Sequence, residues 1–440
     1  METVLLHKSA FLYVTSIFRL SSFVFANALL TGITKTFVPF YSSFPEIFSN
    51  FINHHQKLVA DELDRLTGYQ YTFVEVMPIP EWITNSGYPD YSQLPYVLRA
   101  WENEENKRKA FALASEADVA LFAGIEVLDF QVFRLKKTNK LTFEVSERWL
   151  KRGWVNLFSP NLLKSQWYYH TIFFNKKIYK LCSSAYAARD QYKLFSFKNR
   201  CFKWGYFTKI EELDLSCKLQ SCNLDTLTIM WCSRFVGWKH PELAIMMAAR
   251  LKEKGYNFML DMYGSGSMFS KALQLTNDLG INDVVNFCGN VPNDKLLLAM
   301  REHDIFLLTS DKNEGWGAVA NEAMSNGCVL VASHAIGSVP FLIKDRITGM
   351  IFQSSRTDRG FGRFRGTVDE EALDSLCEKV EWLWEHPTER KQIALNGYES
   401  IKEIWSPSNA AHNLMQLIDD LQNNHDISIK EGPCSKDFPR

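Results

Sequence analysis

The sequence predicts an α/β protein that folds into two doubly wound domains, each built on a parallel sheet. Short apolar runs typical of buried strands alternate along the chain with longer amphipathic stretches typical of helices. The 440 residues suffice for roughly two or three domains, and 46% of them are apolar, too many for a disordered chain. The nine cysteines include no CxxC pair, so neither a disulfide framework nor a zinc ribbon is indicated. We therefore expect a cytoplasmic protein with reduced thiols.

The first 32 residues precede the predicted domains and are apolar without being uniformly so. Residues 10–32 are rich in Leu, Phe, Val and Ala, but Arg19 lies near their middle. A central arginine costs a membrane-spanning helix roughly 2.5 kcal/mol or more. No cleavage site of small residues follows a basic start. A spanning helix, an interfacial helix and an ordinary extension therefore all stay open for residues 1–32.

Residues 33–208 are predicted to form the N-terminal domain, in which apolar runs alternate with helix-forming stretches. We expect a helix from residue 53 to residue 66 and a loop over residues 42–50. The expected strands are residues 34–41, 71–76, 118–123 and 140–145. Residues 209–225 are expected to link this domain to the next.

Residues 226–406 are predicted to form the C-terminal domain, where strands and helices alternate more clearly. The expected strands are residues 226–231, 258–263, 284–288, 305–309, 329–332 and 350–352. The expected helices are residues 241–254, 271–279, 294–301, 317–326 and 370–386. A last helix over residues 407–422 is expected to close the fold, and the polar tail of residues 423–440 is expected to be loose.

Charge is unevenly distributed, although the whole chain carries a formal net charge of only −1. Residues 134–209 contain 17 Lys and Arg against three acidic residues, and Trp, Tyr and Phe are interspersed among them. Such a mixture suits an anionic membrane surface or an acceptor that bears phosphate. Single-stranded nucleic acid and a solvated helix face beside core aromatics are the competing interpretations.

Two glutamates eight residues apart carry the strongest local signal, in the run Glu314-Gly-Trp-Gly-Ala-Val-Ala-Asn-Glu322. The strand of residues 305–309 precedes them, and Gly315 and Gly317 stand where a helix should begin. Free N–H groups at a helix start favour a diphosphate, and glycine lets backbone approach a ligand closely. Glu314 could then accept hydrogen bonds from sugar hydroxyls and Glu322 from a ribose. An ordinary helix surface is the alternative.

Cations lie at the same predicted edge of the sheet. The run Ser233-Arg-Phe-Val-Gly-Trp-Lys239 follows the first strand of the C-terminal domain, which places Arg234 and Lys239 in its first loop. Two cations there can hold a diphosphate and stabilise it as a leaving group without a metal ion. Two further loops at this edge carry small residues: Gly264, Ser265 and Gly266, and Gly337 with Ser338. Four loops converging on one sheet edge are typical of a ligand crevice.

This order of motifs resembles the donor half of GT-B glycosyltransferases of family 4, the glycosyl transferases group 1. The resemblance rests on SRFVGWK, YGSG, CGNV, EGWGAVANEAMSNG and ASHAIGSVP, in that order between residues 226 and 352. It implies the GT-B fold, two Rossmann-like doubly wound domains that face a cleft. Residues 33–208 would form the acceptor-binding domain and residues 226–406 the nucleotide-sugar-binding domain. It also implies a retaining, metal-independent transfer of a hexosyl group from a UDP- or GDP-linked sugar, with no cofactor.

The resemblance assigns roles to individual residues. Glu314 would contact the donor sugar, Glu322 the ribose, and Arg234 and Lys239 the diphosphate. The residues that would line the donor pocket are Gly264, Ser265, Gly266, Gly315, Trp316, Gly317, Gly337 and Ser338. The helix of residues 407–422 would cross back to the N-terminal domain.

The chain departs from the family pattern in its N-terminal half. The family's Gly-rich loop after the first strand is absent, and residues 42–50 stand in its place. His54 and His55 could touch the acceptor or the donor phosphate, or be ordinary surface. Glu147 lies where many members keep a cleft-facing histidine, and it could act as an acid–base or acceptor-orienting group, or pair with Arg148. Phe341 replaces the acidic residue that usually follows the GSVP loop.

We therefore expect a glycosyltransferase that acts on a saccharide acceptor, lipid-linked, in the biosynthesis of a surface polysaccharide. It would be cytoplasmic or peripheral at the inner face of the membrane, and no nucleic acid partner is expected. A nucleotide-sugar epimerase of the same fold and a catalytically silent membrane-associated binding subunit are the alternatives.

Overall fold

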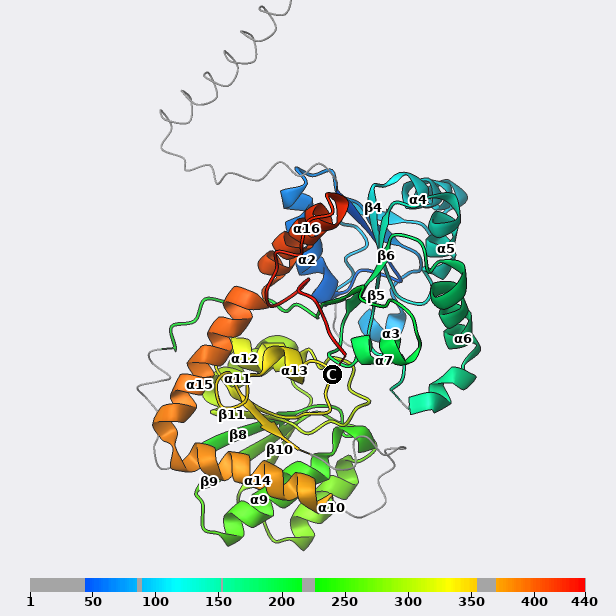
Figure 1. The fold of residues 1–440 in the computed structure, drawn as a ribbon. Coiled ribbons are helices and arrows are strands. Elements are labelled where there is room, and N and C mark those ends of the chain that lie inside the picture. Colours follow the sequence, from blue (N-terminus) through cyan, green and yellow to red (C-terminus); the bar gives the residue numbers. More distant parts are fainter. Residues whose placement is uncertain (1–43, 85–88, 152, 216–225, 354–368, 440) are drawn as a thin grey trace, which may run out of the picture. The chain divides into compact units, whose positions relative to one another are not determined.

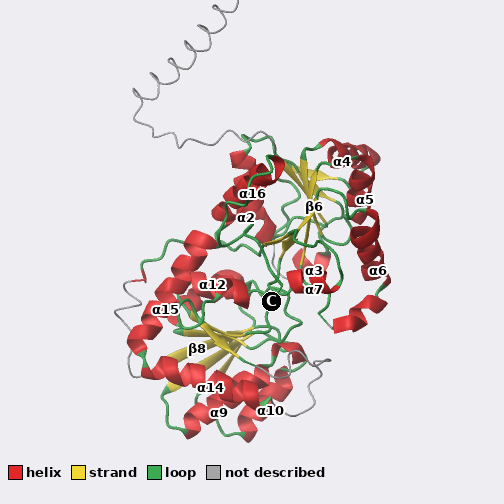
Figure 2. Ribbon diagram, in the orientation of Figure 1, coloured by secondary structure: helices red, strands yellow, loops and turns green. Residues whose placement is uncertain are grey.

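A computed structural model describes residues 44–84, 89–151, 153–215, 226–353 and 369–439. Within these residues the chain forms two sheets in which all paired strands run parallel, and helices flank each sheet (Figure 1; Figure 2). The prediction of two doubly wound α/β domains is confirmed. The expected extension of residues 1–32, the expected strand of residues 34–41 and the second part of the expected linker lie outside the described residues.

The first sheet has seven strands in the order β3-β2-β1-β4-β5-β6-β7. Its strands are β1 (Pro45–Ser49), β2 (Phe73–Glu75), β3 (Val97–Arg99), β4 (Val119–Ala123), β5 (Leu141–Ser146), β6 (Ile178–Cys182) and β7 (Cys201–Lys203). Its helices are α2 (His54–Leu66), α3 (Glu81–Thr84), α4 (Glu104–Glu116), α5 (Leu128–Lys137), α6 (Pro160–Trp167) and α7 (Ala187–Lys193), with short helical segments η1 (Gly153–Phe158) and η2 (Tyr168–Ile172).

The second sheet has six strands in the order β10-β9-β8-β11-β12-β13. Its strands are β8 (Leu227–Cys232), β9 (Phe258–Tyr263), β10 (Val285–Gly289), β11 (Ile305–Leu308), β12 (Val329–Ser333) and β13 (Met350–Phe352). The helices that follow β7 are η3 (Gly237–Lys239), α9 (Pro241–Glu253), α10 (Phe269–Asp278), α11 (Asn293–Glu302), α12 (Val319–Ser325), α13 (Val339–Leu342), α14 (Glu370–Glu385), α15 (Pro387–Glu399), η4 (Ser400–Ile404) and α16 (Pro407–Gln422).

The strand β1 corrects the expectation of a loop over residues 42–50. All five of its residues are buried, and it lies between β2 and β4 in the first sheet. Pro45 is tolerated because it is the first residue of the strand. The charged Glu46 interrupts the apolar pattern that would have predicted a strand. Its buried carboxylate accepts a hydrogen bond from the N–H of Thr72 at 2.8 Å. Phe48 stacks on Phe122 of β4, with ring centroids 4.8 Å apart, so the strand belongs to the core.

The helix α2 confirms the helix expected over residues 53–66. Asn53 caps it by accepting hydrogen bonds from the N–H groups of His55 and Gln56, both at 3.0 Å. The side chain of Gln56 accepts in turn from the N–H of Asn53, which completes a capping box. The last helix, α16, packs against α2, although the whole second sheet separates the two in sequence.

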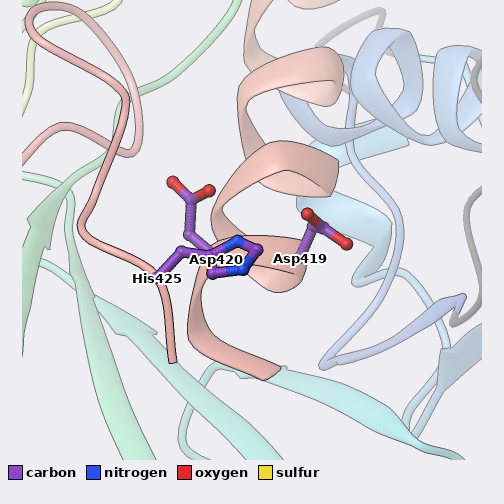
Figure 3. Close-up of side chains that lie close together, drawn as sticks. All are labelled: Asp419, Asp420 and His425. Atoms are coloured by element: carbon purple, nitrogen blue, oxygen red, sulfur yellow. The ribbon is translucent and has the colours of Figure 1, made fainter. Parts of the chain in front are cut away.

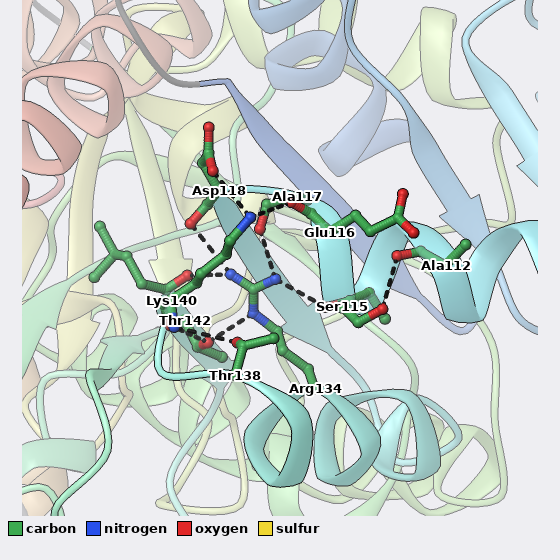
Figure 4. A network of polar contacts seen from close by, with 11 residues as sticks. Ala112, Ser115, Glu116, Ala117, Asp118, Arg134, Thr138, Lys140 and Thr142 are labelled. Carbon is green, nitrogen blue, oxygen red and sulfur yellow. Dashed lines mark hydrogen bonds and ion pairs between the residues drawn. The ribbon is translucent and has the colours of Figure 1, made fainter.

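A buried arginine fastens the end of α4 to β5 of the first sheet (Figure 4). Arg134 of α5 donates hydrogen bonds to the carbonyls of Ala114, Ala117 and Leu141, each at 2.8 Å. Its Nε donates to the Thr142 hydroxyl, also at 2.8 Å. Carbonyls at a helix end have no partner within the helix, so a side chain that satisfies several of them at once fixes where α4 stops.

Residues 423–439 are not loose, which corrects the expectation of a loose tail for the part of it that the structure describes. The N–H of Cys434 donates to the carbonyl of Lys203 at 2.7 Å, and the N–H of Lys203 donates to the carbonyl of Ser435 at 2.9 Å. Phe202 and Lys436 form an antiparallel bridge. The outer edge of β7 offers unpaired backbone groups, and the tail satisfies them. The polar composition of the tail could not indicate this, because backbone hydrogen bonds join it to β7.

None of the described helices has the length and apolar character needed to span a bilayer.

Candidate functional site

The predicted donor residues come together at the carboxyl edge of the second sheet. The loops after β8, β9, β11 and β12 all leave this edge, because the four strands are parallel neighbours or near neighbours. Backbone hydrogen bonds join the first two loops, from Ser233 N–H to the Tyr263 carbonyl at 3.1 Å and from Phe235 N–H to the Ser265 carbonyl at 2.8 Å. The loops after β8 and β9 are thus hydrogen-bonded to each other at the carboxyl edge of the second sheet.

Lys239 and Glu314, for which the sequence predicts different ligand contacts, are direct partners. Lys239 ends η3, Glu314 lies in the loop after β11, and the ammonium forms a hydrogen-bonded ion pair with the carboxylate. Only about one-tenth of each side chain is exposed. The hydroxyl of Ser310 donates a second hydrogen bond to the same carboxylate at 3.0 Å. The pair holds both charged groups at the edge of the sheet in a fixed orientation.

Trp238 is a site residue that the sequence reasoning missed. Its ring centroid lies 4.3 Å from Nζ of Lys239 and 5.9 Å from the guanidinium carbon of Arg234. The ring face attracts cations and so keeps both side chains near it. Arg234 is exposed whereas Lys239 is buried, so one cation faces solvent and the other is enclosed. The position of Trp238 between the two cations in SRFVGWK was the signal.

Glu322 lies on α12, and its carboxyl group is largely buried. Burial raises its pKa to about 7, and a hydrogen bond with the Asn293 side chain opposes part of that shift. Its charge adds to burial in raising the pKa of the Cys232 thiol to about 12, so its carboxylate is near the end of β8. A partly protonated carboxylate at this edge can respond to pH within the neutral range.

The glycines of the YGSG loop serve contacts within the chain. Gly264 and Gly266 have φ angles of +123° and +152°, which disfavour other residues. A Cβ on Gly264 would overlap with the carbonyl of Ser233, and one on Gly266 would overlap with the carbonyl of Phe235. Ser265 between them is exposed. Both glycines let the loop after β9 approach the loop after β8, and their contact with a donor stays a prediction.

The side chain of Trp316 faces the interior of the protein, and the predicted contact of this residue with the donor stays a prediction. It is fully buried, and its indole N–H donates to the Asn321 side chain at 2.8 Å. Its ring packs near those of Tyr206 and Trp405, at centroid distances of 6.1 and 5.7 Å. Gly205 packs directly against this indole, where a Cβ on any other residue would overlap with the ring. Trp316 is a core residue, and a family motif cannot tell an inward-facing from a ligand-facing tryptophan.

The remaining predicted glycines, with Ser338, shape the loops around Glu314. Gly317 has a φ of +79°, in the left-handed region. The carbonyl of Gly337 accepts from the N–H of Ala185 at 2.8 Å, which connects this loop to residues after β6. Ser338 is fully buried, and its hydroxyl has no hydrogen-bond partner among the residues that the structure describes.

A second cluster brings together the weaker predictions from the N-terminal half. The hydroxyl of Tyr206 donates to Oε1 of Glu147 at 2.7 Å, and Lys151 forms an ion pair with the same carboxylate. The ring of His55 stacks on that of Tyr206 with 5.4 Å between centroids, and the His54 ring lies 3.8 Å from that of His55. Burial, aided by the neighbouring His54, lowers the pKa of His55 to about 3, so His55 is neutral.

Residues of the first sheet and its helices enclose a pocket of about 950 Å³ beside this cluster. The pocket is lined by Glu147, His55 and Tyr206, and by the cationic side chains of Arg148 and Lys151. His54 is not among its lining residues. Sequence reasoning missed Tyr206 and Lys151, although Lys151 stands four residues after Glu147. A pocket of this size with carboxylate, imidazole and cationic groups can hold a polar molecule with several hydroxyls.

One cluster in the described part of the chain has metal-ligand geometry: Asp419, Asp420 and His425 (Figure 3). Its ligand atoms lie within 4.8 Å of one another. The carboxylate of Asp420 already accepts hydrogen bonds from the N–H and hydroxyl of Ser428, both at 2.8 Å. That of Asp419 accepts from the Asn423 side chain at 2.9 Å. These carboxylates hold the chain that follows α16, and the donor edge does not include them.

Comparison with known proteins confirms the resemblance over the second sheet. Residues 221–360 match the family model of glycosyl transferases group 1. D-inositol 3-phosphate glycosyltransferase of Mycobacteroides abscessus is 33% identical over 135 residues, 30% of either chain. N-acetyl-alpha-D-glucosaminyl L-malate synthase of Bacillus anthracis is 36% identical over 96 residues, 22% of this chain and 24% of that one. The chain thus matches less than a third of the length of these curated relatives.

Solved structures extend the likeness to both sheets. Sucrose-phosphate synthase from Thermosynechococcus elongatus superposes with a TM-score of 0.60 at 14% identity, covering 87% of this chain and 100% of that one. Anabaena HepE, solved in complex with UDP and glucose, has a TM-score of 0.58 at 14% identity and the same coverage. At such identities the likeness shows the fold, which is GT-B.

Proposed function

We propose that the chain transfers a sugar from a nucleoside diphosphate sugar to a saccharide acceptor. The match of residues 221–360 to the family model of glycosyl transferases group 1 and the GT-B fold support this proposal. The observation that carries the proposal is the Lys239–Glu314 pair, with Arg234 beside it, at the carboxyl edge of the second sheet. These residues lie inside the family match. HepE, which shares the fold, was solved with UDP and glucose, and this supports a UDP-linked donor.

The pair gives donor binding a mechanism. A diphosphate brings negative charge to the edge and competes with Glu314 for the ammonium of Lys239. The carboxylate of Glu314 then becomes available to accept hydrogen bonds from the sugar hydroxyls. Diphosphate capture and sugar orientation are therefore coupled through one ion pair. Lys239 and the exposed Arg234 stabilise the charge that develops on the leaving diphosphate, which makes a divalent metal unnecessary.

We assign the transfer a retaining, same-face course. The bond between the anomeric carbon and the diphosphate oxygen breaks, and the acceptor oxygen bonds to the same face of the sugar. The proton of the acceptor hydroxyl passes to the departing phosphate oxygen. Glu147 is proposed to orient the acceptor hydroxyl rather than to attack the sugar, because Lys151 and Tyr206 already engage its carboxylate.

The acceptor is proposed to occupy the pocket beside Glu147 and His55, and to be a lipid-linked saccharide in surface polysaccharide biosynthesis. The pocket volume of about 950 Å³ accommodates a saccharide. The basic, aromatic segment of residues 134–209 contributes Arg148 and Lys151 to the same pocket, and these suit a phosphate on the acceptor.

The test is donor turnover by the purified full chain with a panel of UDP- and GDP-sugars, measured as nucleoside diphosphate release with and without EDTA. We expect release from one donor, unchanged by EDTA, and an acceptor-linked product of retained anomeric configuration. Loss of release in EDTA would overturn the metal-independent account. Conversion of the donor to an isomer without release would identify an epimerase. Donor binding with no reaction across acceptors would indicate a silent binding subunit.

A further inference from the structure

Two neighbouring helical segments of the first domain, η1 and α6, expose an unusual amount of apolar surface. None of the described residues in either segment is buried. Their exposed side chains nevertheless include large aromatic and aliphatic groups, and η2 and the residue pair after it continue the series. Six of these side chains define what we call the η1–η2 surface: Trp154, Phe158, Leu163, Trp167, Ile172 and Phe174. Phe158 has the largest exposed fraction, 85%.

The exposed charges of the chain segment that carries the η1–η2 surface have one sign. Between Lys151 and Lys209 the sequence has a single acidic residue, Asp190. Asp190 is buried and is engaged by the guanidinium of Arg148, at 3.3 Å, and by a backbone N–H. No carboxylate of this segment therefore reaches the surface. Exposed lysines follow in the same segment: Lys164, Lys177, Lys193 and Lys198.

A strained turn adds a further aromatic side chain. Phe195 has a φ of +52°, which is rare for a bulky residue, and 80% of it is exposed. The side chain of Gln166 on α6 donates a hydrogen bond to the carbonyl of Leu194, so the turn is fastened to the helix that carries Leu163 and Trp167. The ring of Phe195 therefore adds to the exposed apolar side chains beside α6.

We propose that the η1–η2 surface docks the protein on an anionic phospholipid membrane. Rings and aliphatic chains insert at the boundary between headgroups and acyl chains, while lysines meet the lipid phosphates. Aliphatic Leu163 and Ile172 would contribute little to stacking on nucleic acid bases, whereas a membrane buries them. The cores of protein interfaces are depleted in lysine, which disfavours a second copy as the occupant.

The docking surface adjoins the proposed acceptor pocket. Asn156 and Ser159, in and just after η1, and Leu162 and Ser165 of α6 line that pocket. The segments that would lie on the membrane therefore also form a wall of the cavity beside Glu147. A lipid-linked acceptor could remain in the bilayer while its saccharide enters the pocket. This last step rests on the proposed function, whereas membrane docking does not.

The test is flotation of the purified full chain with vesicles of phosphatidylcholine alone or mixed with phosphatidylglycerol. We expect binding to the mixed vesicles only, weakened by added salt. The double variant Trp154→Ser/Phe158→Ser should bind the mixed vesicles at least roughly tenfold more weakly, since two large rings lose their apolar burial. Lys193→Ser should lose roughly fivefold, because a cation near the surface is worth about that much.

Matched controls replace residues outside the surface. Phe438→Ser removes an exposed aromatic of the tail, and Lys295→Ser removes an exposed lysine of α11. Both should bind vesicles as the unaltered protein does. All four variants should keep their release of nucleoside diphosphate with a water-soluble acceptor, so a failure of docking is distinguishable from a failure of catalysis.

Three results would overturn the proposal. The first is equal vesicle binding by the unaltered protein and the Trp154→Ser/Phe158→Ser variant. The second is a change of oligomeric state in that variant, seen by size exclusion with light scattering, which would assign the surface to a second copy. The third is binding of a single-stranded oligonucleotide that is lost in the same variants while vesicle binding is absent.

Discussion

The carboxylate of Glu147 lies directly against Gly315: a Cβ at position 315 would overlap with both oxygens of that carboxylate. Glu147 follows β5 of the first sheet, and Gly315 follows β11 of the second. The group proposed to orient the acceptor therefore touches the loop that carries Glu314. The hydroxyl of Tyr206 holds the carboxylate in this position.

Gly315→Ala should displace the Glu147 carboxylate and lower nucleoside diphosphate release by roughly a hundredfold, the size of effect expected for a catalytic group misplaced by about 1 Å. Steady-state turnover with the preferred donor measures it. In a Glu147→Ala background the overlap is gone, so adding Gly315→Ala should then cost little. A full penalty in that background would show that Gly315 acts without Glu147.

Lys239→Ala should abolish most turnover and also destabilise the protein. The substitution leaves Glu314 buried without its cation, a situation that typically costs about 3 kcal/mol or more. Urea unfolding and donor turnover, measured on the same preparations, separate the two effects. Lys239→Met combined with Glu314→Gln should recover most of the lost stability but not turnover. Recovery of turnover in that double variant would contradict the leaving-group role of Lys239.

Donor affinity should depend on pH through Glu322. Burial raises the pKa of this carboxyl to about 7, so it protonates as the pH falls below neutrality and then accepts hydrogen bonds from a ribose poorly. We expect the dissociation constant of the donor to rise by up to about tenfold per pH unit below pH 7. Calorimetric titration between acid and neutral pH measures this. In Glu322→Gln the slope should be absent; an unchanged slope would place the titrating group elsewhere.

Stability should fall at alkaline pH because of His240. Burial alone would lower its pKa, but hydrogen bonds with the carboxylates of Asp311 and Glu242 outweigh burial and raise it to about 9. A folded-state pKa above the unfolded value of about 6.5 stabilises the fold fully below that pH. The stabilisation is lost as the pH rises from about 6.5 through 9. The urea midpoint should drop over this window, and His240→Gln should show a smaller drop.

The second sheet was predictable because its strands are short apolar runs bounded by clear turn residues. The expected strands at residues 258–263 and 350–352 coincide with β9 and β13. The first sheet was harder, because β3 has only half-buried residues and β6 carries Lys180, which is fully buried. Lys180 is paired with Glu144 of the neighbouring strand. The charge of Lys180 interrupts the apolar pattern of β6, and sequence periodicity cannot detect the distant partner that allows it to be buried.

In the candidate site, the residues could be predicted from the sequence but the contacts between them could not. Lys239 and Glu314 could be located, because strand ends and motif residues mark their loops. The ion pair between them could not be predicted, because 75 residues separate them in sequence and only the sheet order brings β8 beside β11. The stacking of His55 on Tyr206 and the overlap between Glu147 and Gly315 are likewise tertiary contacts. A motif indicates which groups are present, and the fold decides which of them meet.

The tail that covers β7 is synthesised much later than β7 itself. The ribosome releases β7 long before Cys434 and Ser435, because the whole second sheet is made in between. At ordinary elongation rates that interval lasts on the order of ten seconds or more. During it the first sheet has an open edge, and α2 lacks its packing partner α16. The outer edge of β7 in the nascent chain is thus open to pairing with foreign β-strands until Cys434 and Ser435 have been synthesised.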